Sequence, residues 1–257
     1  MRSISGSEIK SARDIVLVRL DQRRILVVGC DATGAVGPKP VDVLRVDAAT
    51  VGKFAARVAL METIAVGANP ICLSVTLSVE PFPTGREIIR GIRRELTRSK
   101  LGYVRMVRSS EKNFPVQQTG VGVTVVGLVH DPKIGKCKRG DLVIAIGQPC
   151  VGREVLKGER TRSIADLADV HALLRLPFVH EIIPVGSKGV LKEARILATD
   201  SKLRFLPRKP VTLDMNKSAG PATVALCAIS PSNRARLQEI IDKPLNPIGE
   251  LIDIEHT

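Results

Sequence analysis

Short runs of Val, Ile and Leu alternate along this chain with segments of helical periodicity, and this alternation limits what the chain can fold into. Between residues 71 and 79 apolar and small polar residues take alternate positions, which is typical of a half-buried strand. Only 2% of the residues are aromatic and Trp is absent, so a core must be built from aliphatic side chains. Aliphatic strands interleaved with helices predict a layered α/β (α+β) fold with a mixed sheet.

The expected elements follow one another in a regular order. In the first half we expect strands at 15–20, 25–30, 71–79, 103–107 and 121–130, and helices at 47–66 and 86–100. In the second half we expect strands at 142–147, 179–183 and 222–229, and helices at about 163–175, 188–199 and 232–242. Asp47 is a suitable N-cap for the first helix. The helix at 86–100 should bury Ile88, Ile89, Ile92 and Leu96 and leave its arginines in solvent.

The length of 257 residues suits two domains of ordinary size. A break in pattern follows the strand at 121–130, where Asp131-Pro132 leads into a segment rich in Lys and Gly. We therefore expect an N-terminal domain at 1–135 and a C-terminal domain at 136–257, the second containing both α and β elements.

The formal net charge of +13 has two interpretations, a nucleic-acid surface or a site for a small anionic molecule. Basic residues are spread over both halves and stacking aromatics are scarce, so we do not favour nucleic acid, although it stays an alternative. The five cysteines form no C-x-x-C pair, which argues against a zinc site or a disulfide framework. No apolar run approaches the length of a membrane span, and we expect a cytoplasmic protein.

Four carboxylates occupy positions that a purely structural role explains poorly. Asp14 immediately precedes one apolar run, and Asp31 follows another. Glu62 falls in helical register with apolar residues, and Glu111 lies in the polar loop 109–113. Carboxylates that converge from strand ends suggest a magnesium–polyphosphate site. The alternatives are turn residues for the two aspartates, an ion-pair partner for Glu62 and a solvated loop acid for Glu111.

The chain has neither a Walker A loop nor a G-x-G-x-x-G turn between strand and helix, so any ATP site must have another architecture. Three segments resemble the ATP-binding core of the aminoimidazole ribonucleotide synthetase superfamily, which includes thiamine-monophosphate kinase and selenophosphate synthetase. They are Val28-Gly29-Cys30-Asp31, Val51-Gly52-Lys53 and the run from Met61 to Pro70. Residues 140–147 resemble the strand that opens the second domain in that superfamily.

The resemblance implies that acidic side chains hold Mg²⁺ against the phosphates of ATP. It assigns Asp14, Asp31 and Glu62 as metal ligands, with Asp31 also catalytic. Glu111 would stand in for the acid of a G-G-D-T motif that this chain lacks. The resemblance further implies a homodimer that forms through the N-terminal sheets.

Four more residues are candidates for contact with ATP. Lys39 lies in the Gly/Pro-rich loop after Asp31, and Asn113 belongs to the polar loop. Thr119 and Gly120 close that loop and would offer a hydroxyl and a backbone N–H. The alternatives are a solvated loop lysine and a plain start of a strand.

The turn at 184–189 departs from the superfamily pattern. Lys188 stands where relatives such as thiamine-monophosphate kinase carry the last Asp of D-x-S-D-G, and an ammonium group cannot ligate magnesium. This turn and the segment 217–223 resemble the α-ribazole kinase branch. The resemblance implies that Ser187, Lys188 and Ser218 bind a nucleoside-like acceptor. At an expected helix N-terminus, Lys188 would neutralise the γ-phosphate or bind the acceptor, and the alternative is a lysine in the first helical turn that faces water.

The sequence therefore predicts an ATP- and Mg²⁺-dependent kinase acting on the 5′-hydroxyl of α-ribazole. Three alternatives stay open. They are a thiamine-monophosphate kinase or ATP-dependent ligase of the same superfamily, a protein that binds nucleotide without turnover, and a basic nucleic-acid-binding protein.

Overall fold

The computed structural model describes residues 8–254, which divide into two compact units. The first unit takes the described residues up to Ile64 together with Ala68–Asp131. The second takes Ala65–Gly67 and the chain from Pro132 onward. The boundary that we expected at residue 135 lies a few residues beyond this division.

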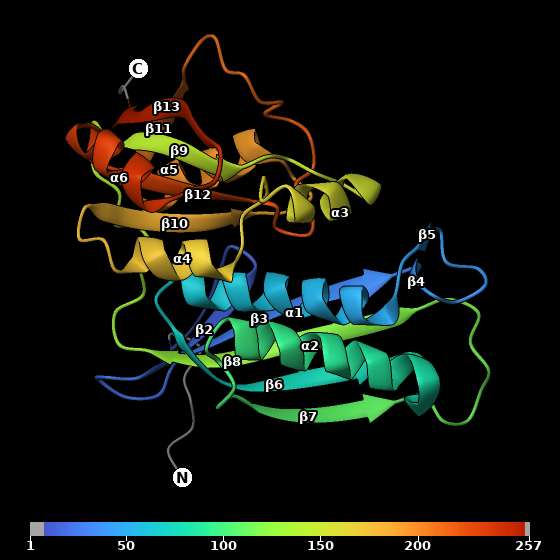
Figure 1. Ribbon diagram of the computed structural model, residues 1–257. Helices are drawn as coiled ribbons and strands as arrows, with labels where there is room; N and C mark the ends of the chain where they lie inside the picture. The colour runs from blue at the N-terminus through green and yellow to red at the C-terminus, as the bar shows by residue number, and fades with distance from the viewer. Residues whose placement is uncertain (1–7, 255–257) are drawn as a thin grey trace. The chain divides into compact units, whose positions relative to one another are not determined.

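A six-stranded mixed sheet forms the centre of the first unit (Figure 1). Its strands, in spatial order, are β1 (Ile9–Ala12), β2 (Ile15–Arg19), β3 (Ile25–Gly34), β8 (Gly120–Val129), β6 (Asn69–Leu77) and β7 (Arg105–Ser110). β6 and β7 are parallel, and every other neighbouring pair is antiparallel. A small parallel pair, β4 (Val36–Gly37) and β5 (Leu44–Arg45), lies within the Gly/Pro-rich loop.

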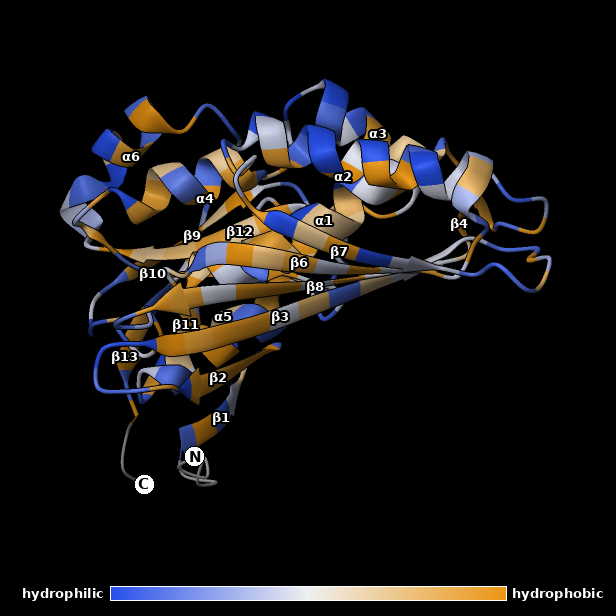
Figure 2. Cartoon of the chain, turned by 90° about the horizontal axis from the view of Figure 1, so that it is seen from below, coloured by the Kyte–Doolittle hydropathy of each residue, from blue (hydrophilic) through white to orange (hydrophobic). Residues whose placement is uncertain are grey.

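Two helices, α1 (Ala48–Ala65) and α2 (Arg86–Arg98), cover one face of this sheet (Figure 1). Asp47 caps α1 as predicted, because its Oδ1 accepts a hydrogen bond of 2.9 Å from the backbone N–H of Thr50. A short π-helical turn, η2 (Pro81–Gly85), leads into α2. The apolar face of α2 is buried as predicted, with Ile88 and Ile92 fully enclosed. Figure 2 shows the hydrophilic and hydrophobic residues that share this helix.

The two helices touch through glycines, so their backbones come close together. A Cβ atom on Gly52 of α1 would overlap the carbonyl oxygen of Ile88 in α2. In return, a Cβ atom on Gly91 of α2 would overlap the carbonyl oxygen of Ala49 in α1. A buried ion pair adds to this contact, since Arg57 Nε of α1 donates to Glu95 Oε1 of α2 at 2.7 Å.

The second unit has a five-stranded sheet in which all neighbours are antiparallel. Its spatial order is β10 (Val179–Val185), β12 (Val224–Ile229), β9 (Leu142–Gly147), β13 (Leu245–Asp253) and β11 (Leu203–Pro207). β9 has the predicted bounds. β11 and β13 were not predicted, because prolines and a bulge between Pro247 and Gly249 interrupt their alternation.

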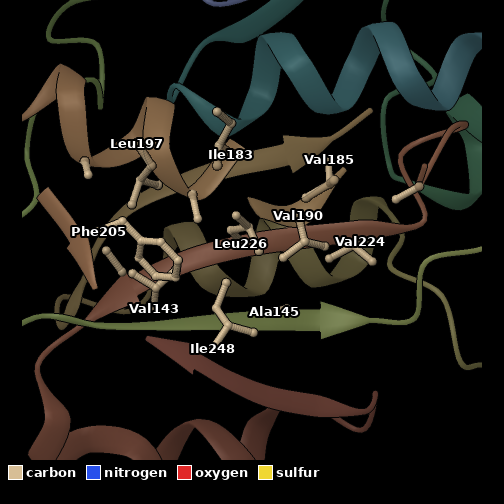
Figure 3. Packing of buried hydrophobic residues seen from close by; sticks show 14 of the residues in the cluster. Val143, Ala145, Ile183, Val185, Val190, Leu197, Phe205, Val224, Leu226 and Ile248 are labelled. Atoms are coloured by element: carbon tan, nitrogen blue, oxygen red, sulfur yellow. The ribbon is translucent and has the colours of Figure 1, made fainter. Parts of the chain in front are cut away.

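The helices of the second unit are α3 (Arg153–Arg160), α4 (Leu167–Leu174), α5 (Val190–Asp200) and α6 (Arg234–Ile240), with a 3₁₀ turn η3 (Pro231–Asn233) before the last. α5 packs on β10, β11 and β12. Aliphatic side chains from these elements and from β9 and β13, with one aromatic ring, that of Phe205, form the core in Figure 3. Every residue of β12 is buried, so both faces of the sheet are covered at its centre.

The α/β fold class predicted from the sequence is confirmed. α3 was not predicted, because it is short and five of its eight residues are charged. Within the described residues, no helix is both long and apolar enough to cross a membrane.

Candidate functional site

Asp31 lies inside β3 and not at the strand end that we expected. It pairs with Val123 of β8, and β3 continues as far as Gly34. Side chains alternate along a strand, so Asp31 shares a face with Gly29, where an added Cβ would meet Ala59 and Thr63 of α1. The carboxyl is therefore directed to the helix-covered face and is partly buried. This burial raises the pKa of Asp31 to about 6, and a backbone hydrogen bond offsets it only in part.

Asp14 and Glu62 belong to elements next to Asp31. Asp14 is exposed in the turn between β1 and β2, and the following residue, Ile15, pairs with Gly29. Glu62 is half-buried near the end of α1. In residues 8–254 no three His, Cys, Asp or Glu side chains gather closely enough to hold a metal by themselves. The predicted trio of metal ligands is thus not assembled as a ready-made cluster in this chain.

Asp42, which the sequence analysis did not single out, anchors the Gly/Pro-rich loop. Its carboxylate accepts hydrogen bonds of 2.7 Å from the backbone N–H of Lys39, the backbone N–H of Thr119 and the hydroxyl of Thr119. The Thr119 hydroxyl that we expected to be offered to ATP is therefore bonded to Asp42, as is the Thr119 backbone N–H. Gly120 begins β8 and pairs with Gly34. This agrees with the alternative stated for Gly120, a plain start of a strand.

Lys39 is paired with a carboxylate. Its Nζ lies 2.5 Å from Oε2 of Glu80, and the hydroxyl of Thr84 donates to the other oxygen of Glu80. Burial by itself would raise the pKa of Glu80, but the hydrogen bonds from Lys39 and Thr84 outweigh it and lower that pKa. Lys39 therefore holds its loop against the segment that precedes η2, and any contact with a phosphate would have to compete with Glu80.

Glu111 organises its own loop. Its Oε1 accepts hydrogen bonds from the backbone N–H groups of Asn113 at 2.7 Å and Phe114 at 3.2 Å. These bonds lower the pKa of Glu111. The loop is also shorter than predicted, because β7 extends through Ser110. Glu111 and Asn113 thus form a local turn, which is the structural alternative for this acid.

One end of the second sheet gathers the loops that we predicted to receive the acceptor. Val185 at the end of β10 and Gly147 at the end of β9 both pair with Val224, the first residue of β12. The turn after β10 and the segment before β12 are therefore neighbours. The backbone N–H of Ala219 donates to the carbonyl of Gly186, which ties the two loops together.

Ser187, Lys188 and Ser218 all lie in these joined loops. Lys188 is exposed in the turn just before α5, as expected from the sequence. Ser187 is exposed beside it, and Ser218 Oγ accepts a hydrogen bond of 3.3 Å from the N–H of Gly220. The structure thus brings together three residues that are separated by about thirty positions in the sequence.

A further ion pair belongs to the same end of the sheet. Lys217 Nζ lies 2.7 Å from Oε2 of Glu154, at the start of α3. Cys150 precedes this helix, and its backbone N–H donates to the hydroxyl of the buried Thr223. Burial and the negative charge of Glu154 raise the pKa of the Cys150 thiol above its ordinary value. Neither Cys150 nor Glu154 had a recognisable signal in the sequence.

Residues 12–129 match the family described as AIR synthase related protein, N-terminal domain. No curated protein matches the chain.

Solved structures share the fold over nearly the whole chain. A thiamine-monophosphate kinase from Stenotrophomonas maltophilia K279a has a TM-score of 0.62 at 18% identity, covering 97% of this chain and 90% of its own. The structure described as AaThiL complexed with AMPPCP and TMP has a TM-score of 0.65 at 15% identity, covering 94% and 85%. The hydrogenase maturation protein HypE in complex with ATP has a TM-score of 0.61 at 15% identity, covering 92% and 79%.

The family match covers the first unit, and the shared fold extends over the second. The resemblance recognised from the sequence is thereby confirmed over residues 12–129, which match the AIR synthase related N-terminal domain, and the chain as a whole shares its fold with a solved thiamine-monophosphate kinase.

Proposed function

We propose that this protein is an ATP- and Mg²⁺-dependent phosphotransferase whose acceptor is the 5′-hydroxyl of a nucleoside-like molecule, α-ribazole being the first candidate. The observation that carries the proposal is Asp31. A carboxyl that is partly buried on the covered face of β3, with its pKa raised to about 6, is costly for a fold unless a cation offsets its charge.

Magnesium fits this donor set if substrate phosphates and water supply the remaining ligands. Mg²⁺ is commonly bound by one or two carboxylates together with substrate phosphates and water, so a cluster of three acids is not required. Asp31 would provide the main protein ligand, with Asp14 and Glu62 as further candidates. When bound, the ion would neutralise charge on the phosphate oxygens during transfer. The contribution of Asp31 itself is a carboxylate oxygen on the helix-covered face of β3.

The acceptor side of the proposal rests on the joined loops of the second unit. Lys188 is an exposed cation just before an eleven-residue helix, so its ammonium and the N-terminal end of α5 both favour an anionic or polar group. Ser187 and Ser218 add hydroxyl groups to the same loops. Lys188 cannot ligate magnesium, so this position disfavours an acceptor phosphate bridged by metal, as we infer for thiamine monophosphate.

Solved structures of the same fold support the use of ATP. Their descriptions name AMPPCP and TMP for one protein and ATP for another. We extend the nucleotide to this chain as part of the proposal, together with a homodimer formed through the first-unit sheet. Val16 and Ile71 on that sheet are partly exposed hydrophobic side chains, which is compatible with a contact between two copies.

The proposal is tested by incubating the purified protein with ATP, Mg²⁺ and a panel of acceptors, and measuring ADP. The panel contains α-ribazole, thiamine monophosphate and the common nucleosides. We expect ADP with α-ribazole, and we expect Asp31→Asn to abolish it while circular dichroism shows an unchanged fold. Asp253→Asn is the matched control, because Asp253 is an exposed acid in a surface ion pair with Arg139.

Three outcomes would contradict parts of the proposal. ADP formed only with thiamine monophosphate would overturn the acceptor. ADP with no panel member would favour a protein that binds nucleotide without turnover. Undiminished turnover by Asp31→Asn at ordinary Mg²⁺ concentration would remove Asp31 from the metal site.

A further inference from the structure

The first unit contains a strongly basic concavity that borders the polar loop of Glu111 but includes none of the proposed metal ligands. It has a volume of about 940 Å³ and lies between α2, the edge strand β7 and the η2 turn. Five of its lining side chains are the arginines of α2, namely Arg86, Arg90, Arg93, Arg94 and Arg98. Arg108 of β7 and Lys112 of the following loop add two more cations. We call this feature the α2–β7 groove.

No acidic residue lines the groove, so its charge is not balanced from within. Arg90 is paired with Glu87, one turn earlier on α2. Within the described residues Arg86, Arg93, Arg94, Arg108 and Lys112 have no ion-pair partner. Like charges at helical spacing destabilise a helix, and an anionic ligand removes that repulsion. The cations that the sequence spreads along a helix face are thus concentrated by the fold in one hollow.

An aromatic side chain also lines this hollow. Phe82 of η2 is 69% exposed and lies among the lining residues with Pro81. The chain has only six Phe and Tyr residues, and Tyr103 and Phe114 of the same unit are exposed as well. Scarcity of aromatics argued against nucleic acid at the level of the sequence. The structure shows that half of them are in solvent on the first unit, one of them in the groove.

The row of arginines along α2 is long enough to contact several successive phosphates of a nucleic-acid strand, and not only one phosphate group. From Arg86 to Arg98 the helix rises about 18 Å, at 1.5 Å per residue. One DNA strand carries a phosphate roughly every 3.4 Å, so about five phosphates fall along this length. The triphosphate of one nucleotide occupies only part of it. A positively charged channel beside an exposed ring is the usual arrangement for single-stranded nucleic acid, in which bases stack on the aromatic face.

From these features we propose that the α2–β7 groove binds single-stranded nucleic acid through its phosphates, with Phe82 as a stacking surface for a base. The site is formed by residues of the first unit alone and does not depend on the kinase activity proposed above. Specificity for base sequence is not expected, because arginines directed at phosphates carry no base information.

The test is fluorescence anisotropy of the whole protein with a labelled single-stranded 12-mer, measured over a range of salt concentration. We expect binding that weakens steeply with salt. The triple variant Arg93→Gln, Arg94→Gln, Arg108→Gln should bind at least tenfold more weakly. Its slope of log affinity against log salt should be shallower by about 2, since each phosphate contact on a single strand contributes about 0.7. Phe82→Ala should weaken binding about tenfold with no change in that slope.

The matched control is Lys192→Gln, Arg195→Gln, Arg208→Gln, which removes the same number of charges from exposed positions of the second unit. It should bind nearly as well as the unaltered protein, and circular dichroism should show that all variants are folded. Equal losses of affinity in the two triple variants would contradict binding in the groove, because the net charge of the protein alone would then explain the affinity. No binding at low salt would also overturn it. Full displacement by tripolyphosphate at matched phosphate concentration, with no effect of Phe82→Ala, would assign the groove to small polyanions instead.

Discussion

Asp42 and Thr119, 77 positions apart in the sequence, form two hydrogen bonds of 2.7 Å, one from the Thr119 backbone N–H and one from its hydroxyl. Both residues are buried. With the third bond, from the backbone N–H of Lys39, this carboxylate fixes the Gly/Pro-rich loop to the start of β8. The loop that follows Asp31 is therefore held by an acid that takes no part in the proposed chemistry.

Asp42→Asn should lower the free energy of unfolding by about 1.5–3 kcal/mol, the usual range for hydrogen bonds to a charged group. An amide also brings N–H donors where three donors already converge. Urea unfolding measures the loss. Thr119→Val is the comparison, because it removes only the hydroxyl donor and should cost about 1 kcal/mol. Equal losses in the two variants would contradict the anchoring role of the charge.

Asp31→Asn should stabilise the fold at pH 7 in the absence of magnesium. The pKa of Asp31 is about 6 in the folded protein, against 3.8 as the ordinary value, because burial disfavours the charged form. The charged carboxylate therefore destabilises the fold above about pH 6. This penalty fades as pH falls from 6 to 4, since the folded state takes up its proton first. The gain at pH 7 should be roughly 1–2 kcal/mol, after allowing for partial exposure.

Asp47→Asn should change stability in the opposite direction to Asp31→Asn, because it should destabilise the fold at neutral pH. Hydrogen bonds from Thr50 outweigh burial and lower the pKa of Asp47, so its stabilising effect is present at neutral pH and lost as the carboxylate is protonated in acid. Thermal unfolding in EDTA between pH 4 and 7.5 measures both variants. Parallel curves for the two would refute the interpretation of Asp31.

Removing one partner of the Arg57–Glu95 pair should strongly lower the free energy of unfolding, whereas replacing both partners with apolar residues should lower it much less. Both side chains are nearly inaccessible to solvent, at 1% and 3% exposure. Arg57→Ala leaves a buried carboxylate without this partner and should cost 3–5 kcal/mol, on the order measured for such pairs. The double replacement Arg57→Met, Glu95→Leu should recover most of the loss. A double variant as unstable as the single one would show that the pair itself stabilises the helix contact.

Gly91→Ala should destabilise the first unit by at least about 1–3 kcal/mol, because its Cβ would overlap the backbone carbonyl of Ala49, which cannot move aside as a side chain can. Gly102→Ala is the control, since a Cβ there has no neighbour within 4 Å. Chemical denaturation of the two variants is sufficient. A Gly91→Ala protein as stable as Gly102→Ala would contradict the close approach of α1 and α2.

Local sequence signals predicted the parts of the fold that local forces determine. The apolar positions of α2 recur at helical spacing, and Asp47 stands where an N-cap is needed, so both were found without any knowledge of the tertiary structure. β3 was predicted too short, because polar residues after Cys30 hide a ladder that backbone atoms continue to Gly34. Asp42 was missed because its partner Thr119 is distant in the sequence and no periodicity connects them.

The residues of the candidate site could be predicted from the sequence, but their contacts with distant segments could not. The resemblance named Asp31, Lys188 and Ser218, but contacts formed between distant segments decide what Lys39 and Thr119 do. Glu80, which pairs with Lys39, follows a strand like many surface acids and gives no sign of that role. The arginines of α2 are a further example. The sequence predicted that they face solvent, whereas the structure places them in a hollow lined by seven cationic side chains.

The glycine contacts between α1 and α2 also determine where those cations lie. Gly52 and Gly91 let the backbones of α1 and α2 approach closely, because a Cβ at either position would overlap a carbonyl oxygen of the other helix. This contact helps to set how α2 is rotated about its axis, and so which way its arginines face. Two residues without side chains thus help to place the cations of the α2–β7 groove.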